Sequence, residues 1–116
     1  MKAFVMILFF LTISCSNDDG PKPICFQDEN MYLAERIKNV TGTIRTQQCG
    51  GEVILIQLDE KIKNYPLGLF QPCNLDTEFQ IDGTRVVFSG YIHMYTFPVD
   101  ICADFFEITD IRLADQ

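Results

Sequence analysis

The sequence predicts an all-β protein folded as a small, strongly curled five-stranded barrel. Its best strand covers residues 84–95, where apolar and polar residues alternate with the two-residue period of a strand that has one buried face. Several further short strands are separated by turns rich in Gly and Pro. Gly42 and Gly90 interrupt strand patterns, and such glycines permit the sharp coiling of a closed sheet. For a body of about 90 residues, a barrel is therefore favoured over a flat sandwich.

Residues 28–39 are ambiguous between helix and strand. They contain many helix formers, with acidic residues early and basic residues late, as the helix dipole prefers. Met31, Leu33 and Ile37 could equally share one side of a strand. We expect one short helix here, with a strand as the alternative.

The middle of the chain predicts a hairpin followed by an irregular crossing. Residues 40–45 and 52–58 read as two strands, and residues 47–51 supply the turn between them. Residues 59–64 are charged, so we expect them to be exposed. Residues 65–75 contain Gly and Pro and predict a loop, and residues 76–79 predict one helical turn.

The last predicted strand covers residues 105–113. The alternation that places Phe106 and Ile108 on one face changes phase before Ile111 and Leu113. A phase change of this kind indicates a β-bulge.

The N-terminus has the features of a secretory signal. Lys2 precedes an apolar run over residues 3–13, which is too short for a helix to cross a bilayer core of roughly 30 Å. Ser14 and Cys15 follow, and then a polar stretch with acidic residues. We expect a signal peptide at residues 1–14, an extended tether at residues 15–27 and a folded domain at residues 28–116.

The Ser14-Cys15 pair with its flanks resembles the lipobox of bacterial lipoprotein precursors, in the loose form of Bacteroidota lipoproteins. Thr12 departs from the usual Leu at the third place before the cysteine. The resemblance implies a lipid on Cys15, membrane attachment through it, and an outer-membrane lipoprotein of the cell envelope that is periplasmic or surface-exposed. An ordinary signal peptide with an unrelated cysteine is the alternative.

Four cysteines remain if Cys15 carries lipid, namely Cys25, Cys49, Cys73 and Cys102. An even number in an oxidising compartment predicts two disulfides. We expect Cys25 to pair with Cys49, and Cys73 with Cys102, because the second pair flanks the central strand. A zinc site is the alternative, but zinc modules bring cysteines in close pairs, and this spacing has none.

Charge and residue types exclude several functions. The formal net charge of −7 argues against nucleic-acid binding, which needs a basic surface. His93 is the one histidine, and no nucleophile motif or calcium-loop pattern is present. The acidic pairs Asp104 with Glu107 and Asp76 with Glu78 are interpreted as solvated surface carboxylates. We therefore expect a protein that is not an enzyme and has no cofactor or metal.

One face of the central strand is a candidate binding surface. The two-residue period places four side chains opposite Phe88 and Ile92: Arg85, Tyr91, His93 and Tyr95. Aromatic residues with an Arg are typical anchors of binding faces. The alternative is that these rings cover the barrel or lie under the crossing at residues 65–75.

A second resemblance covers residues 40–113. The glycine-containing first strand, the Pro-Cys-Asn-Leu stretch ending at Leu75, the Phe-Ser-Gly stretch ending at Gly90, and the closing Cys-Ala-Asp-Phe-Phe-Glu-Ile from Cys102 carry it. Together they are similar to a group of small Bacteroidota lipoproteins with an OB-like barrel. The resemblance implies that fold and brings no activity with it.

These observations favour a non-catalytic, lipid-anchored binding module of the envelope for a protein or glycan. The alternative is a disulfide-braced inhibitor of a hydrolase met at the envelope, such as a lysozyme or protease. In that case residues 65–73, held by Cys73, would form the working loop.

Overall fold

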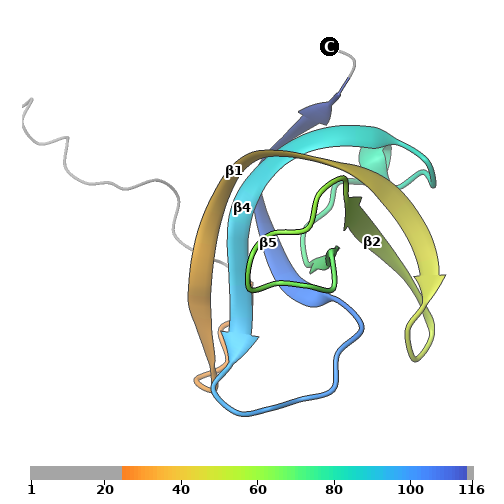
Figure 1. The fold of residues 1–116 in the computed structure, drawn as a ribbon. Coiled ribbons are helices and arrows are strands. Elements are labelled where there is room, and N and C mark those ends of the chain that lie inside the picture. Colours follow the sequence, from red (N-terminus) through yellow and green to blue (C-terminus); the bar gives the residue numbers. More distant parts are fainter. Residues whose placement is uncertain (1–24, 115–116) are drawn as a thin grey trace, which may run out of the picture.

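The computed structural model describes residues 25–114 as a closed barrel of five strands. The strands are β1 (Met31–Gln48), β2 (Glu52–Leu58), β3 (Leu69–Pro72), β4 (Arg85–Tyr95) and β5 (Asp104–Leu113). Their order around the barrel is β1-β2-β3-β5-β4. Figure 1 shows how the long strands β1 and β4 curl side by side around it. The predicted all-β, five-stranded barrel is confirmed. The expected signal peptide, Cys15 and most of the tether lie outside the described residues.

The first strand is much longer than the sequence suggested. Residues 31–43 of β1 pair with β4, and residues 42–48 pair with β2. The strand therefore has two parts, each of which belongs to a different side of the barrel. The expected helix over residues 28–39 is wrong. Two register shifts, after Leu33 and after Ile37, insert extra residues into the strand. These bulges give the buried side chains an irregular spacing that resembles a helical period, and pairing with β4 overrides helix propensity.

The third strand lies inside the segment that was expected to be an irregular loop. β3 pairs antiparallel with β2 and parallel with β5, and thereby closes the barrel. It has four residues and contains Pro72, so it shows no alternation that sequence reading could detect. The helical turn expected after it is confirmed as the 3₁₀ helix η1 (Thr77–Phe79).

Three phenylalanines from different strands form the centre of the barrel. The rings of Phe70 and Phe106 are stacked with centroids 4.5 Å apart, and Phe88 meets both rings edge-on. All three side chains are fully buried. Offset and edge-on packing of this kind adds to the stabilisation from area burial alone.

β4 and β5 lie very close together at Gly90. It pairs with Ile108, whereas the preceding Ser89 pairs with Asp110, so Thr109 is an extra residue in β5. The bulge predicted in the last strand is therefore confirmed. A Cβ atom on Gly90 would collide with the Glu107 carbonyl oxygen and lie 2.7 Å from the Phe106 ring.

Gly42 has a similar role between β1 and β2. A Cβ atom there would lie 2.8 Å from the Gln57 carbonyl oxygen. Both strand glycines thus allow close backbone contact where the sheet curls.

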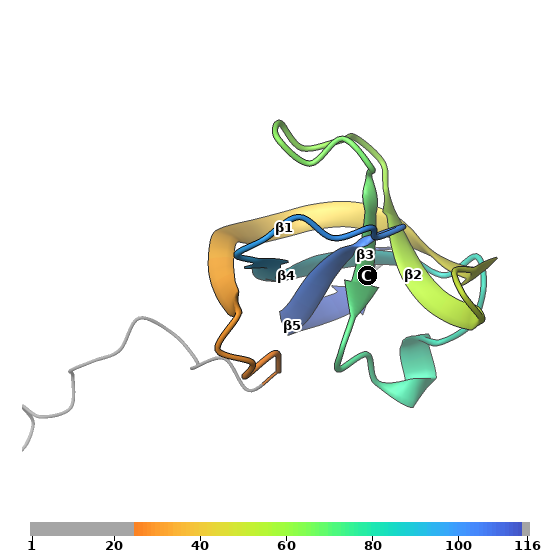
Figure 2. The ribbon, with the colours of Figure 1, turned by 90° about the horizontal axis from the view of Figure 1, so that it is seen from below.

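Two disulfides are present, but the expected pairing is wrong. Cys25 is bonded to Cys73, and Cys49 is bonded to Cys102. The first joins the segment before β1 to the residue after β3, and the second joins the β1–β2 turn to the segment before β5. Figure 2 shows the β4–β5 connection running across the lower end of the barrel toward the β1–β2 hairpin. Closure of the barrel, rather than nearness in the sequence, selects these partners.

Candidate functional site

The aromatic row predicted on β4 lies in a packed cluster on the outside of the barrel, which we call the outer cluster. Its members are Phe26, Tyr91, His93, Tyr95, Phe105 and Glu107. Tyr91 is 5% exposed and His93 is 4% exposed, so neither is open to a ligand in this structure. Whether the row binds a partner stays a prediction, but Tyr91 and His93 are covered, and Tyr95 is half-buried.

The cover of the outer cluster comes from the N-terminal segment and from β1. Phe26 places its ring 4.9 Å from that of His93, and Arg36 lies over the Tyr91 ring with its guanidinium carbon 5.4 Å from the ring centroid. The crossing at residues 65–75, which was the expected cover, does not provide these contacts. Nε2 of His93 and Oε1 of Glu107 lie 3.2 Å apart and share a hydrogen bond.

Arg85 is separated from the other predicted binding residues because it begins β4, whereas they lie toward its end. Its guanidinium donates two hydrogen bonds to the Asp59 carboxylate, at 2.7 and 2.9 Å, and one to Oγ1 of Thr43. These bonds lower the pKa of Asp59 below its usual value. The pair is partly exposed, so its net contribution to stability is small. It fixes the start of the connection between β2 and β3.

The β2–β3 loop, residues 59–68, extends away from the barrel and is a second candidate site. Figure 2 shows it projecting from the barrel beyond β1. Ile62 and Tyr65 form an isolated bridge, and the Tyr65 amide donates to the Ile62 carbonyl at 2.9 Å. Asn64 adopts φ of 77°, which closes this tight turn. The tip residues Lys63 and Asn64 are exposed, whereas Tyr65 is buried in the barrel core.

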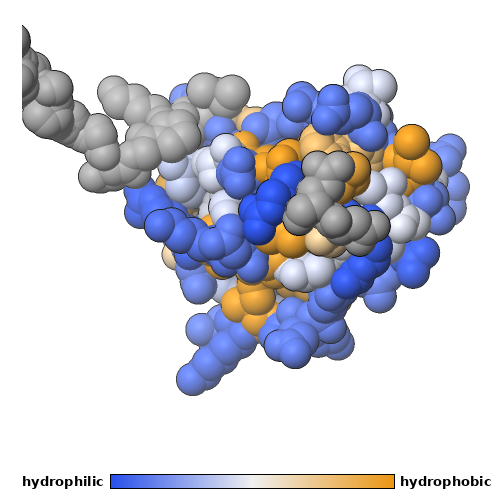
Figure 3. All heavy atoms as spheres, turned by 90° about the horizontal axis from the view of Figure 1, so that it is seen from above, coloured by the Kyte–Doolittle hydropathy of each residue, from blue (hydrophilic) through white to orange (hydrophobic). Residues whose placement is uncertain are grey.

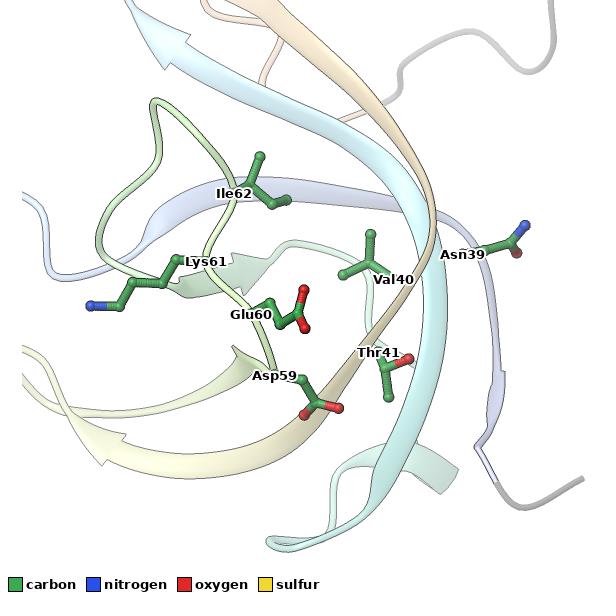
Figure 4. Close-up of a pocket in the computed structure, with 7 residues that line it drawn as sticks. All are labelled: Asn39, Val40, Thr41, Asp59, Glu60, Lys61 and Ile62. Atoms are coloured by element: carbon green, nitrogen blue, oxygen red, sulfur yellow. The ribbon is translucent and has the colours of Figure 1, made fainter.

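Open grooves flank this loop on two sides. The first has a volume of about 440 Å³ and is lined by residues 39–41 of β1 and residues 59–62 of the loop. In Figure 4 the Glu60 carboxylate points toward β1, between Val40 and Ile62, and Lys61 points the opposite way. The second groove, of about 320 Å³, lies between Gln47, Gln57 and Lys61 and the residues around Gly68.

Only part of this site could be predicted from the sequence. The charged run over residues 59–64 was expected to be exposed, and five of its six residues are. The grooves were missed because they form between the loop and strands that lie far from it in the sequence, so no local pattern marks them. The signal that could have found the turn is Lys63-Asn64 between the apolar Ile62 and Tyr65.

Two acidic side chains of β5 are buried. Asp104 is 6% exposed and Glu107 is 3% exposed, so the interpretation of this pair as solvated surface carboxylates is wrong. The other pair, Asp76 and Glu78, is exposed as expected. Both buried carboxylates belong to the start of β5, where pairing with β3 and β4 removes them from solvent.

Burial also raises the pKa of two groups, Asp104 and Tyr65. Burial raises the pKa of the Asp104 carboxyl above its usual value. The pKa of Tyr65 is raised mainly by burial and further by Glu35, whose carboxylate accepts a hydrogen bond from the tyrosine hydroxyl. The acidic surroundings of Tyr65 therefore keep its hydroxyl protonated as a donor.

Replacing Asp104 with Asn is expected to raise stability at neutral pH. The folded-state pKa of Asp104 lies above its unfolded value of about 3.9, so the ionised form costs stability at pH 7. Below the unfolded pKa the carboxyl is protonated in both the folded and the unfolded state, so its burial no longer lowers the stability. The difference in melting temperature between Asp104→Asn and the parent should disappear there. Melting temperatures of both proteins at pH 7 and near pH 3.5 test this, with the exposed Asp100→Asn as control. An equal gain at both pH values would contradict it.

A further face carries exposed apolar side chains. Figure 3, which views the molecule from above, shows hydrophobic groups reaching the surface among hydrophilic ones. Ile81, in the turn before β4, and Leu113, at the end of β5, are exposed. Leu113 also lines a shallow groove together with Phe79 and Ile111.

Residues 25–114 show neither a metal-binding group nor a membrane-spanning helix. Within that part of the chain, no group of three or more His, Cys, Asp or Glu side chains is placed to hold a metal ion. The same residues contain no helix with the length and apolarity to span a bilayer. Compared with protein-family models and with curated proteins, the sequence gives no match.

Proposed function

We propose that this protein is a non-catalytic, lipid-anchored binding module of the bacterial cell envelope, and that the β2–β3 loop with its two grooves is its recognition surface. The observation that carries the proposal is a projecting turn held rigidly at its base and bordered by open space on two sides. A rigid surface loses little conformational entropy on binding, which favours affinity. The occupant is a protein or a glycan.

Several features support the location of the proposed module. Two disulfides are suited to an oxidising compartment outside the cytoplasm. The lipobox-like sequence at Cys15 supports a lipid anchor, and a closed five-stranded barrel is compatible with the OB-like fold that the second resemblance implies. Incorporation of labelled palmitate by the wild type but not by Cys15→Ala tests the anchor, and label on both proteins would refute it.

The charge distribution opposes nucleic acid as the ligand. The protein is acidic overall, and Arg45, Arg85 and Arg112 each lie beside an aspartate. A continuous basic surface, which phosphate backbones require, is not formed by these residues.

Removing three of the four charged side chains of the loop is expected to abolish partner capture. The variant is Glu60→Ala/Lys61→Ala/Lys63→Ala, in which all three positions are exposed. Exposed substitutions change stability by about 0.5 kcal/mol or less each, so the melting temperature should stay within a few degrees. Pull-down from intact cells and glycan-array binding would be compared with Asp110→Ala/Arg112→Ala, a control on β5. Unchanged capture by the loop variant would contradict the proposed surface.

An inhibitor of an envelope-encountered hydrolase is the second candidate function. The observation that favours it is the same turn, since Lys63 and Asn64 project from a base fixed by Tyr65 and by the Arg85–Asp59 pair. The sequence predicted residues 65–73 as the inhibitory loop, but residues 69–72 form β3. We therefore place the inhibitory residues in the turn at Lys63 and Asn64 instead. Titration against a panel of lysozymes and proteases separates the two functions. No inhibition at micromolar protein would eliminate the inhibitor.

A further inference from the structure

We infer that the open edge of β5 pairs with the same edge of a second copy of this chain, so that two barrels form an antiparallel dimer centred on Ile111. This edge belongs to the last strand and is separate from the β2–β3 loop. The dimer therefore does not depend on the proposed recognition surface.

The second half of β5 continues beyond the strand that closes the barrel. β3 pairs with β5 only at residues 104–106. The Asn74 side chain extends this pairing by one position, because its amide donates to the Ile108 carbonyl and its oxygen accepts from the Ile108 amide, each at 2.9 Å. In Figure 1 the end of β5 reaches past the curve of β1 and β4. Residues 110–113 therefore have β4 on one side and no strand of the described residues on the other.

The backbone groups on this open side belong to Ile111 and Leu113. The Ala114 amide donates to the Arg85 carbonyl, so the Ala114 backbone faces β4. Backbone groups alternate in direction along a strand, so Arg112 also faces β4, whereas Ile111 and Leu113 face away from it. Within residues 25–114, no backbone hydrogen bond from another segment reaches these two positions on that side. Unpaired amide and carbonyl groups of this kind are a template for another strand.

Open space borders the edge at the same residues. A groove of about 370 Å³ is lined by Glu78 and Phe79 of η1 and by residues 111–113 of β5. The Leu113 side chain is 38% exposed, and Ile111 is half-buried. η1 therefore leaves room beside β5 for an added strand.

The charges that flank Ile111 favour a second copy as this strand. Asp110 and Arg112 lie on the face opposite Ile111, and their side chains are 67% and 52% exposed. In antiparallel pairing centred on Ile111, Asp110 of each copy stands opposite Arg112 of the other, which gives two cross-strand ion pairs. A register centred on Asp110 or on Arg112 would instead place like charges opposite each other. The sequence Asp-Ile-Arg is thus complementary to itself in one register only.

Backbone direction agrees with this register. Because Ile111 faces the open side, the Ile111 residues of the two copies can exchange both backbone hydrogen bonds, as directly opposite residues of an antiparallel pair do. Ile111 and Leu113 of both copies then share one face of the joined sheet, and the ion pairs lie on the other. Identical edges that pair about a two-fold axis are both used up, so assembly stops at two. The contact is short, so we expect a weak dimer.

The test exchanges the two charges singly and together. All proteins carry Cys15→Ser, so that a lipid cannot drive association. Asp110→Arg and Arg112→Asp each place like charges opposite in both cross-strand pairs, whereas Asp110→Arg/Arg112→Asp restores opposite charges. Sedimentation equilibrium over a wide range of protein concentration measures the dimer Kd. Amide hydrogen exchange at Ile111, measured over the same range, reports whether this edge is paired.

We expect the wild type to dimerise and each single exchange to raise the dimer Kd about tenfold or more. The double exchange should return the Kd to near the wild-type value, and an equimolar mixture of the single variants should form a mixed dimer. Ile111 exchange should slow as the wild-type concentration rises. Asp100→Arg, which changes the net charge by the same amount at another exposed position, should dimerise as the wild type does.

A wild type that stays monomeric at every concentration would leave this edge to a strand of another protein and overturn the inference. A double exchange that does not restore the dimer would also overturn it, as would a dimer in which Ile111 exchange does not slow. The exchange measurement needs no substitution, so a variant that folds poorly does not prevent the test. The β2–β3 loop variant should dimerise as the wild type does, so the dimer and the proposed function can fail independently.

Discussion

Gly90→Ala is expected to lower the free energy of unfolding by about 3 kcal/mol or more, because its methyl group has no space. The new Cβ atom would overlap the Glu107 carbonyl oxygen and press on the ring of Phe106. The obstructing atoms are backbone and a fully buried ring, so neither can move without disturbing the pairing of β4 and β5. Urea denaturation followed by circular dichroism measures the change.

Gly83→Ala is the matched control for this substitution. Gly83 has φ of 93°, but nothing lies within 4 Å of the position that its Cβ would take. The cost there is conformational only, on the order of 1–2 kcal/mol. If Gly90→Ala lowered the free energy of unfolding no more than Gly83→Ala does, the close contact of β4 with β5 at the bulge would be contradicted.

Removing either disulfide is expected to cost about 4 kcal/mol on the loop-entropy model. The bonds close segments with sequence separations of 48 and 53 residues, and the cost follows from the greater freedom of the unfolded chain. Small domains have total stabilities of about 5–15 kcal/mol, so loss of one bond removes a large share. Denaturation midpoints of Cys49→Ser/Cys102→Ser and Cys25→Ser/Cys73→Ser, measured against the oxidised parent, test this expectation.

The pairing itself can be tested by counting thiols. In a Cys15→Ser background, Cys25→Ser/Cys73→Ser should leave no free thiol, because both partners of one bond are removed together. The mismatched Cys25→Ser/Cys49→Ser should leave two, on Cys73 and Cys102. If instead the first variant had two free thiols and the second had none, Cys25 would be paired with Cys49, and Cys73 with Cys102, as the sequence predicted.

The covered outer cluster changes how mutations on β4 should be interpreted. Tyr91 and His93 were predicted as binding residues on an outer strand face, and that face is a second packed layer in the structure. A loss of function after their substitution could therefore result from disturbed packing as well as from a lost contact with a partner. The exposed positions of the β2–β3 loop are better probes of binding, because their side chains support little of the fold.

The sequence by itself determined the features that depend on neighbouring residues. The alternation in β4, the hairpin of residues 40–58, the turn at η1 and the bulge at Thr109 are all encoded in short stretches of chain. Strand periodicity and turn chemistry are local properties, so they can be predicted without a structure. An even set of four cysteines likewise predicted two disulfides, although it left three pairings possible.

Only the tertiary structure decided the features that depend on residues far apart in the chain. The first half of β1 became a strand because β4 lies beside it, and β3 became one because β2 and β5 enclose it. The same closure paired Cys25 with Cys73, buried Asp104 and Glu107, and placed Phe26 over His93. Barrel closure brings together segments separated by about 50 residues, and the contacts formed there outweigh local preference.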